Sequence, residues 1–216
     1  GSTPPGRFFG AAADFADLYL FVRRHADLFD DWQMISRVNL LVPTDPLDVN
    51  RAFLQMRRLA EMHVPYQPIQ RRPGITPDLR RKDATNITWQ LVQGKSGSSD
   101  GPPILDSLKA AEIEPFAAVK AVSAGLRTVV KANPRQPGTR VIHLLREGPL
   151  TEKLPTGALT LNAWALPSAA SYDVVMHTPN GESRVLGVAH RQGGPAGDLI
   201  LALPYPAEWA VIVVRA

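Results

Sequence analysis

The chain contains five histidines, the side chains best suited to proton transfer or metal binding near neutral pH. They are His25, His63, His143, His177 and His190. No two of them are three or four residues apart, so no helix face would present two imidazole ligands, and no zinc-protease motif occurs. The chain also lacks cysteine, which excludes disulfides, thiolate metal sites and cysteine nucleophiles. We therefore expect no metal, no cofactor and no catalytic residue, and we interpret His143 as a strand histidine bonded to a backbone carbonyl.

Two other chemical patterns are incomplete. Glycoside hydrolysis needs two carboxylates that face each other across a cleft, whereas the glutamates outside the first predicted helices are scattered along the chain. These are Glu112, Glu114, Glu147, Glu152, Glu182 and Glu208. The Gly94-Lys95-Ser96 triplet is similar to the end of a phosphate-binding loop, but that loop requires a glycine where this chain has Trp89. We expect neither chemistry from these residues.

Three residues are candidates for binding a ligand. Alternation over residues 159–164 places Trp164 opposite the apolar face of a predicted strand, where its indole ring would stack on a sugar, fill an interface or pack in the core. Tyr172, which begins a later predicted strand, is the second candidate. Asp45 is the third, because it follows the first predicted strand at the edge where open α/β sheets bind ligands. Asp45 followed by Pro46 also fits the N-cap and first position of a helix.

The composition is typical of a folded protein with a hydrophobic core. Of 216 residues 44% are hydrophobic, and no apolar run approaches the roughly 20 residues that cross a bilayer. The net charge of +4 comes mainly from paired arginines, which fall partly in amphipathic helices, where long cations form the solvated face. Without a recognised nucleic-acid-binding signature, we do not expect nucleic acid or membrane as a partner. The compartment stays open, since a soluble cytoplasmic and a secreted protein would both fit.

The first half of the chain predicts a small α/β lobe. A helix over residues 14–29 would bury one stripe of apolar side chains: Phe15, Leu18, Tyr19, Val22, Ala26 and Phe29. An apolar strand over 38–42 is followed by a helix that would bury Val49, Phe53, Met56 and Ala60, and the chain then turns at His63 into a strand over 64–69. This strand-helix-strand unit has the length of a parallel crossover, and its prolines place the second strand near an edge.

The second half predicts an antiparallel β-sandwich. Residues 94–103 are typical of a flexible linker, and residues 104–124 are moderately helical up to Pro115. Seven short strands with a period of two follow, over 126–131, 139–145, 158–164, 172–177, 183–190, 198–203 and 209–215. The sequence thus predicts an α+β protein with a three-layer α/β lobe over residues 1–124 and a sandwich over 125–216.

Several blocks carry a resemblance to one family. They are residues 7–10, 15–23 and 26–30, the strand over 37–45, the segment 59–66, and the later strands over 140–145, 201–203 and 209–211. Together they resemble the region after the catalytic barrel in β-galactosidase-like TIM-barrel glycoside hydrolases, which holds a flavodoxin-like, amidotransferase-like domain and a β-sandwich. The resemblance covers about two-thirds of the chain. It departs over residues 71–124, which lack the further strands and helices of a full flavodoxin-like domain.

The resemblance implies a non-catalytic accessory role. The barrel that carries the acid and nucleophile carboxylates is absent, and amidotransferase chemistry uses a cysteine that this chain lacks. The expected partners are a catalytic barrel domain or other subunits of a glycoside hydrolase, joined through buried apolar area with arginines at the rim. Two other hypotheses stay open: a carbohydrate-binding module that uses Trp164 and Tyr172 to hold a polysaccharide, and a self-contained glycan hydrolase that uses Asp45.

Overall fold

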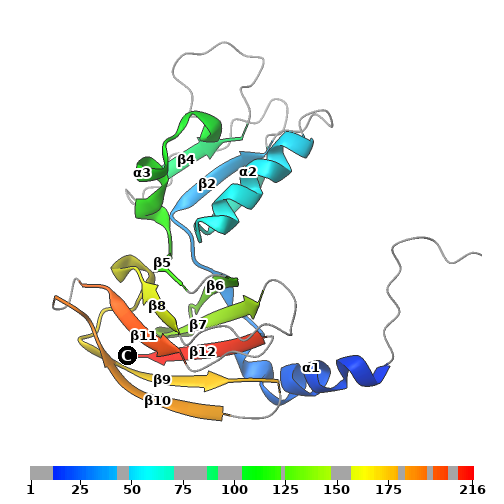
Figure 1. Cartoon of the computed structure of the whole chain (residues 1–216), viewed down its shortest axis with the longest axis vertical. Helices are drawn as coiled ribbons and strands as arrows, with labels where there is room; N and C mark the ends of the chain where they lie inside the picture. The colour runs from blue at the N-terminus through cyan, green and yellow to red at the C-terminus, as the bar shows by residue number, and fades with distance from the viewer. Residues whose placement is uncertain are drawn as a thin grey trace, which may run out of the picture.

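The protein is described by a computed structural model, which covers residues 12–42, 49–70, 87–91, 104–122, 125–146, 157–179, 183–193, 197–203 and 209–216. Its helices and strands form two lobes that lie one above the other along the longest axis (Figure 1). One lobe is rich in strands and the other alternates strands with helices, so the predicted mixed α+β class is confirmed.

Six strands form the larger sheet. In spatial order they are β1 (Gln33–Met34), β6 (Leu126–Asn133), β7 (Gln136–Arg146), β12 (Trp209–Arg215), β9 (Ser171–His177) and β10 (Ser183–His190). Every neighbouring pair in this sheet is antiparallel. The strands β9 and β10 pair as the two arms of a hairpin, as the turn residues around Gly181 predict, although Asn180 and Gly181 lie outside the described residues.

A second, three-stranded sheet faces the first. Its order is β11 (Leu199–Leu203), β8 (Gly157–Leu161) and β5 (Val119–Ala121), and its pairs are antiparallel. Apolar side chains from both sheets form one buried cluster, to which Leu159 and Leu161 of β8 contribute opposite Leu144 and Ile212 of the larger sheet. Because alternate residues of each strand point into this layer, the period of two in the sequence correctly indicated a sandwich.

The first helix belongs to the sandwich. Helix α1 (Ala12–Arg24) leads through the 3-10 turn η1 (Ala26–Leu28) into β1, which pairs with β6. From η1, Leu28 joins Val141 of β7 and Val211 of β12 in a buried cluster on the outer face of the six-stranded sheet. From Ala12 on, the chain therefore runs along the sandwich, crosses to the α/β lobe and returns through β5, although all of residues 1–124 were predicted to form one lobe.

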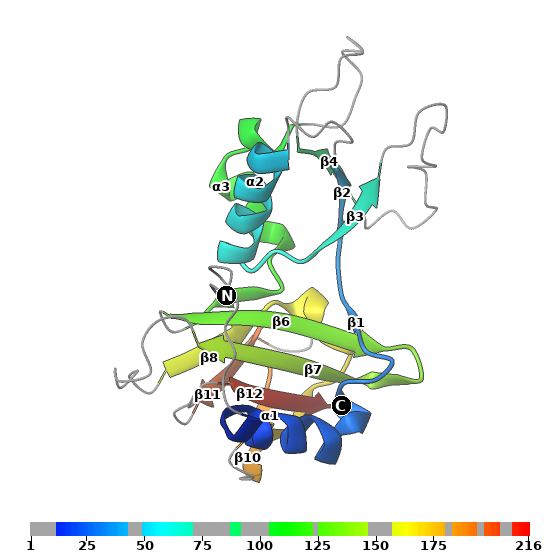
Figure 2. The same cartoon turned by 90° about the vertical axis from the view of Figure 1, so that its right-hand side faces the viewer.

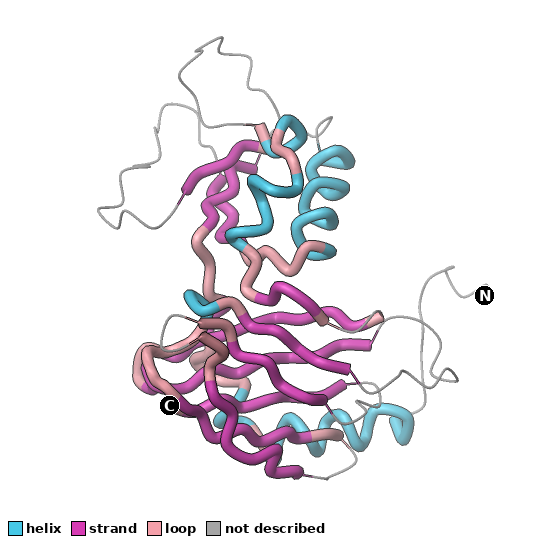
Figure 3. Tube along the Cα trace, turned by 60° about the vertical axis from the view of Figure 1, so that its left-hand side comes forward, coloured by secondary structure: helices cyan, strands magenta, loops and turns pink. Residues whose placement is uncertain are grey.

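The α/β lobe is built on three parallel strands. They are β3 (Tyr66–Gln70), β2 (Val38–Val42) and β4 (Ile87–Gln90) in spatial order, and helix α2 (Val49–Glu61) connects β2 to β3. The predicted parallel strand-helix-strand unit is confirmed, and β3 is an edge strand as its prolines predicted. Figures 2 and 3 show α2 and the short helix α3 (Ala110–Ile113) on the same side of this sheet, so the described part of the lobe has two layers.

Residues 104–116 form short helical pieces instead of one helix. The 3-10 turn η3 (Leu105–Ser107) precedes α3, and η4 (Glu114–Phe116) follows it with Pro115 in its first turn. Pro115 thus ends α3, as its missing amide hydrogen predicts. Ile113 and Leu105 are buried against the parallel sheet, together with Trp89 of β4. This segment closes the lobe before the chain returns to the sandwich.

Helix α2 ends where the sequence places the turn. His63 has a φ of 54°, in the left-handed region that side chains rarely adopt. Its amide bonds the carbonyl of Ala60 at 3.1 Å, and the amide of Val64 bonds the carbonyl of Leu59 at 2.9 Å. This pair of bonds is a Schellman motif, in which a left-handed residue closes the helix and the next one packs back on its last turn. Val64 and Leu59 are both buried in the lobe's core.

Candidate functional site

Tyr172 is buried within the sandwich. Its side chain is 1% exposed, and its hydroxyl lies 2.6 Å from the carbonyl oxygen of Pro167, to which it donates. The Nε of Arg191 donates to the same hydroxyl at 2.7 Å. A tyrosine with a covered ring and a fully bonded hydroxyl packs the core, so in this structure Tyr172 offers no ring face on which a sugar would stack.

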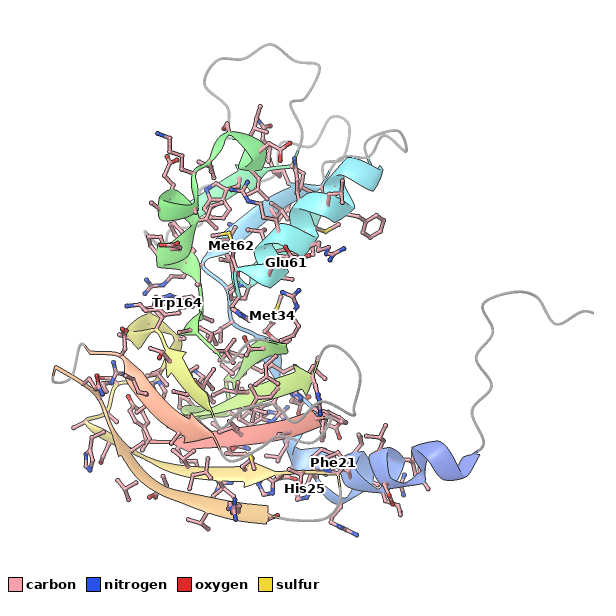
Figure 4. All side chains as sticks on the ribbon, viewed as in Figure 1. Phe21, His25, Met34, Glu61, Met62 and Trp164 are labelled. Carbon is pink, nitrogen blue, oxygen red and sulfur yellow. The ribbon has the colours of Figure 1, made fainter. Side chains whose placement is uncertain are left out.

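Trp164 lies between the two lobes. Strand β8 ends at Leu161, and Trp164 falls in the 3-10 turn η5 (Ala163–Ala165) rather than at the end of the predicted strand. Its half-buried ring packs against the sandwich core, and the guanidinium carbon of Arg37 lies 4.8 Å from the ring centroid. Figure 4 shows Trp164 at the level where the lobes meet. Because Arg37 immediately precedes β2, this cation–π contact attaches the start of the α/β lobe to the sandwich.

Asp45, the third predicted residue, lies outside the described residues. Within the residues that the structure describes, no group of three or more histidine, aspartate or glutamate side chains is placed to hold a metal ion. In the same part of the chain, no helix is long and apolar enough to cross a membrane.

Further bonds join the lobes around the end of α2. The Nδ1 of His63 lies 2.9 Å from the hydroxyl of Thr128 on β6, and the carbonyl of His63 accepts a bond from the amide of Ala118 at 3.0 Å. The hydroxyl of Ser36 donates to the carbonyl of Pro65 at 3.0 Å. A guanidinium nitrogen of Arg127 lies 3.7 Å from Glu61. None of these contacts could be predicted from the sequence, because the partners of each pair are far apart in the chain.

Helix α2 presents apolar side chains to solvent and buries a polar one. Phe53 is 61% exposed and Leu54 is 68% exposed, although Phe53 was predicted to lie on the buried face. Gln55 is instead 3% exposed, and both atoms of its amide are buried without a hydrogen-bond partner in the described part of the chain. The buried face therefore consists of Ala52, Gln55 and Leu59, a rotation of about one residue from the predicted stripe. We call Phe53, Leu54 and Arg57 the outer face of α2.

Helix α1 makes its contact with the sheet mainly through its last turns. Phe21 is buried, whereas Tyr19, predicted to be buried, is 62% exposed and Leu20 lies beside it in solvent. The ring centroid of Phe21 lies 5.2 Å from that of Trp209 on β12. Figure 1 shows the first part of α1 extending past the end of the sheet. The correct stripe was hidden because Tyr19 and Leu20 are as apolar as the residues that the sheet covers.

Three histidines lie along this contact, and two of them have their rings in contact. The rings of His25 and His177 have centroids 4.6 Å apart, and the ring of His143 lies 5.4 Å from that of Phe29. We call His25, His143 and His177, together with Phe29 and Trp209, the α1 seam. Their positions in the sequence gave no signal of this grouping, because it depends on α1 lying across β7, β12 and β9.

His143 departs from its predicted environment. It is buried, but its Nε2 has no hydrogen-bond partner among the described residues, where we had expected a backbone carbonyl. Burial, together with the nearby charge of Lys131, lowers the pKa of His143 from 6.5 to about 4. The side chain is therefore neutral at physiological pH. Its ring stacks on Trp209 at a centroid distance of 6.0 Å, so the imidazole serves here as an aromatic packing element.

Comparison with known proteins places limits on identification. No protein-family model matches the chain, and no curated protein matches it. Among solved structures, CelM2, a bifunctional glucanase-xylanase from a metagenome library, is similar at 17% identity and a TM-score of 0.30, covering 43% of this chain and 16% of that one. A second structure, described as a glycoside hydrolase, is 11% identical with a TM-score of 0.30 and covers 69% of this chain and 32% of that one.

These structural neighbours are glycoside hydrolases, and the chain spans less than a third of the length of either one. At this level of likeness the neighbours carry no argument about activity. The class that the structure itself defines is a mixed α+β protein whose α/β lobe is attached to an antiparallel sandwich.

Proposed function

We propose that this chain is a non-catalytic association region of a carbohydrate-active enzyme, and that the outer face of α2 contacts a neighbouring domain or subunit of that enzyme. The observation that carries the proposal is the arrangement of α2, in which Phe53 and Leu54 face solvent while Gln55 is buried without partners. Leaving an amide unbonded in a core costs about 1–3 kcal/mol. The two large apolar side chains, because they stay exposed to water, contribute no hydrophobic free energy to folding.

A partner on the outer face of α2 would make this arrangement favourable. Covering a phenylalanine and a leucine side chain contributes roughly 1.5–3 kcal/mol each. Arg57 lies on the same face and pairs with Glu61 at 2.8 Å, so charged groups border the apolar pair. Association surfaces commonly have this composition, with apolar or aromatic residues at the centre and polar residues around them. Tyr19 and Leu20 on α1 offer a second exposed apolar surface.

The link to carbohydrate-active enzymes rests on the sequence blocks that resemble the region after a glycoside hydrolase barrel. On that basis the partner would be the catalytic barrel or another subunit. The exposed apolar side chains on α1 and α2 support an accessory role.

The first test is the length of the native protein and the state of α2 within it. An antibody against this chain would capture the protein from its native source, and its intact mass would then be measured. The mass should correspond to a polypeptide several hundred residues longer than these 216. Hydrogen exchange should then show residues 52–61 better protected in the native protein than in the isolated chain. A native mass near 23.6 kDa with equal protection in both would overturn the proposal.

A pair of variants tests the surface. Phe53→Ser combined with Leu54→Ser should weaken association with the partner domain, measured by sedimentation of the native protein. Val185→Ser on β10 removes a similarly exposed apolar side chain from another surface and serves as the matched control. Equal weakening by both changes would show that general solubility, and not the outer face of α2, had been altered.

The two alternative functions make different predictions. A carbohydrate-binding module would use Trp164. Binding to a polysaccharide in affinity electrophoresis should then be insensitive to salt and abolished by Trp164→Ala. A bound sugar would have to share the indole ring with Arg37. A self-contained hydrolase would turn over an aryl glycoside as the isolated chain and lose that activity in Asp45→Asn. Either result would replace the association role as the primary function.

A further inference from the structure

The α1 seam contains three imidazoles in contact with apolar surroundings. His25 follows the last turn of α1, and its amide bonds the carbonyl of Phe21 at 3.0 Å. His177 ends β9, and its Nδ1 lies 2.9 Å from the hydroxyl of Ser183 at the start of β10. The two rings face each other with centroids 4.6 Å apart. Figure 4 shows Phe21 and His25 at the end of α1 that meets the sheet. A second proton brought to this pair would place two positive charges within contact distance.

The surroundings of His177 in the seam favour its neutral state. Burial lowers the pKa of His177, and the neighbouring His25 and Arg215 lower it further, while Asp27 raises it. Arg215 belongs to the same sheet as His177 and stays beside it whether or not α1 is in place. His25 and Asp27 lie on the α1–η1 segment, so they act on His177 only while that segment is docked.

His143 is also held in its neutral state by its surroundings in the seam. The ring of Phe29, which follows η1, covers it at 5.4 Å, and Lys131 on β6 is the charged group that opposes its protonation. Burial and the charge of Lys131 lower the pKa of His143 to about 4, so the docked seam disfavours its protonated form. Lifting Phe29 away would open the unpartnered Nε2 to water, where the imidazole would titrate near its ordinary value.

Helix α1 has few other attachments. Among its residues whose side chains are described, Phe21 is buried, Leu18 and Val22 are half-buried, and the rest are exposed. In the segment that follows, Leu28 is buried and the indole nitrogen of Trp32 donates to the carbonyl of Asp27 at 2.7 Å. By contrast, β7 and β12 are bonded along seven residue pairs. A change of a few kcal/mol at the seam would therefore release α1 before it opened the sheet.

We propose that the α1 seam is a proton-sensitive clamp: neutral His143 and His177 hold the α1–η1 segment against the sheet through their contacts with Phe29 and His25, and protonation of His143 and His177 releases it. The inference does not depend on the association role proposed above. The pH dependence of the docking free energy follows from linkage. Protons bind more tightly to the released state, so docking of α1 weakens as the pH falls below the ordinary pKa of histidine. Each pKa unit that docking removes from a histidine weakens docking by up to tenfold.

Hydrogen exchange of the full chain tests the clamp. Protection of residues 12–28, corrected for the chemical exchange rate, should fall by at least about tenfold between about pH 7.5 and about pH 5. At each pH it should stay below the protection of β7 and β12, because α1 is released before the sheet opens. The outcome that overturns the proposal is a constant protection of α1, or a protection of α1 equal to that of β7 and β12 at each pH, which would be general unfolding.

Variants separate the clamp from a structural effect. His25→Gln with His177→Gln should make the fall in α1 protection smaller, and adding His143→Phe, which keeps a ring between Phe29 and Trp209, should abolish it. Asp27→Asn removes the group that raises the pKa of His177 in the docked state. The fall in α1 protection should therefore be larger in this variant than in the wild type. His190→Gln, an exposed histidine on β10, should keep the full effect. An unchanged fall in the triple variant, or no increase in Asp27→Asn, would overturn the clamp.

Discussion

The imidazole Nδ1 of His63 and the hydroxyl of Thr128 lie 2.9 Å apart, and their hydrogen bond joins the end of α2 in the α/β lobe to β6 in the sandwich. His63 also accepts the amide hydrogen of Ala118, so one residue holds both the outgoing helix and the returning chain. The position of the lobes thus depends on a residue that itself adopts a left-handed backbone.

Thr128→Val keeps the shape of the side chain and removes the hydroxyl. We expect a loss of about 1 kcal/mol in the free energy of unfolding, because a partly buried hydrogen bond contributes that amount and the imidazole loses one partner. Urea denaturation followed by tryptophan fluorescence measures it. Thr160→Val on β8, at a half-buried threonine away from the lobe junction, is the control. If both variants unfold at the same urea concentration, the bond does not stabilise the junction.

Gln55→Met replaces the buried amide of α2 with an apolar side chain of similar length. Both amide atoms are buried without partners among the described residues, so the change should stabilise the chain by roughly 1–2 kcal/mol. Thermal unfolding monitored by circular dichroism would show a higher midpoint. Gln67→Met, at an exposed position of β3, should change stability little. A lower midpoint for Gln55→Met would mean that the amide is bonded in solution.

The order of the elements could largely be read from the sequence, whereas their contacts could not. Short-range signals such as Pro46, Pro115 and the period of two beyond Gly125 depend on backbone chemistry within a few residues. The buried stripe of α2 was misplaced by about one residue, and in α1 Phe21 is buried where Tyr19 was predicted to be, although Leu18 and Val22 are half-buried as predicted. Tyr19 and Phe53 misled the prediction because they are as apolar as the side chains that are buried in their place. Hydrophobicity alone does not distinguish a face that packs on the sheet from one that is available to a partner.

The grouping of histidines was beyond sequence reasoning for a different reason. His25 follows α1, whereas His143 and His177 come from two strands of the sheet. Only the docking of the α1–η1 segment brings His25 against His177 and Phe29 against His143. Likewise, the sequence does not show that Tyr172 is buried in the sandwich core with its hydroxyl bonded to the carbonyl of Pro167.

Global stability should also depend on pH through His143. Its pKa is about 4 in the folded protein and near 6.5 in the unfolded chain, so the unfolded state binds the proton more tightly. Its contribution is fully present above the unfolded value, is lost as the pH falls through this window, and changes no further below about 4. The loss would amount to roughly 2–3 kcal/mol. Urea midpoints at several pH values measure it, and His143→Phe should flatten the profile. A wild-type profile that is already flat would contradict this assignment.

Replacing His63 with glycine separates its two roles. Glycine adopts the left-handed conformation without strain, so His63→Gly should relieve up to about 1 kcal/mol at the end of α2 while losing the bond to Thr128. In the wild-type background the two effects oppose each other, and the net change should be small. In the Thr128→Val background the bond is already absent, so His63→Gly should stabilise the chain. Unfolding free energies of the four proteins complete the double-mutant cycle. Equal effects in both backgrounds would show that His63 and Thr128 are not coupled.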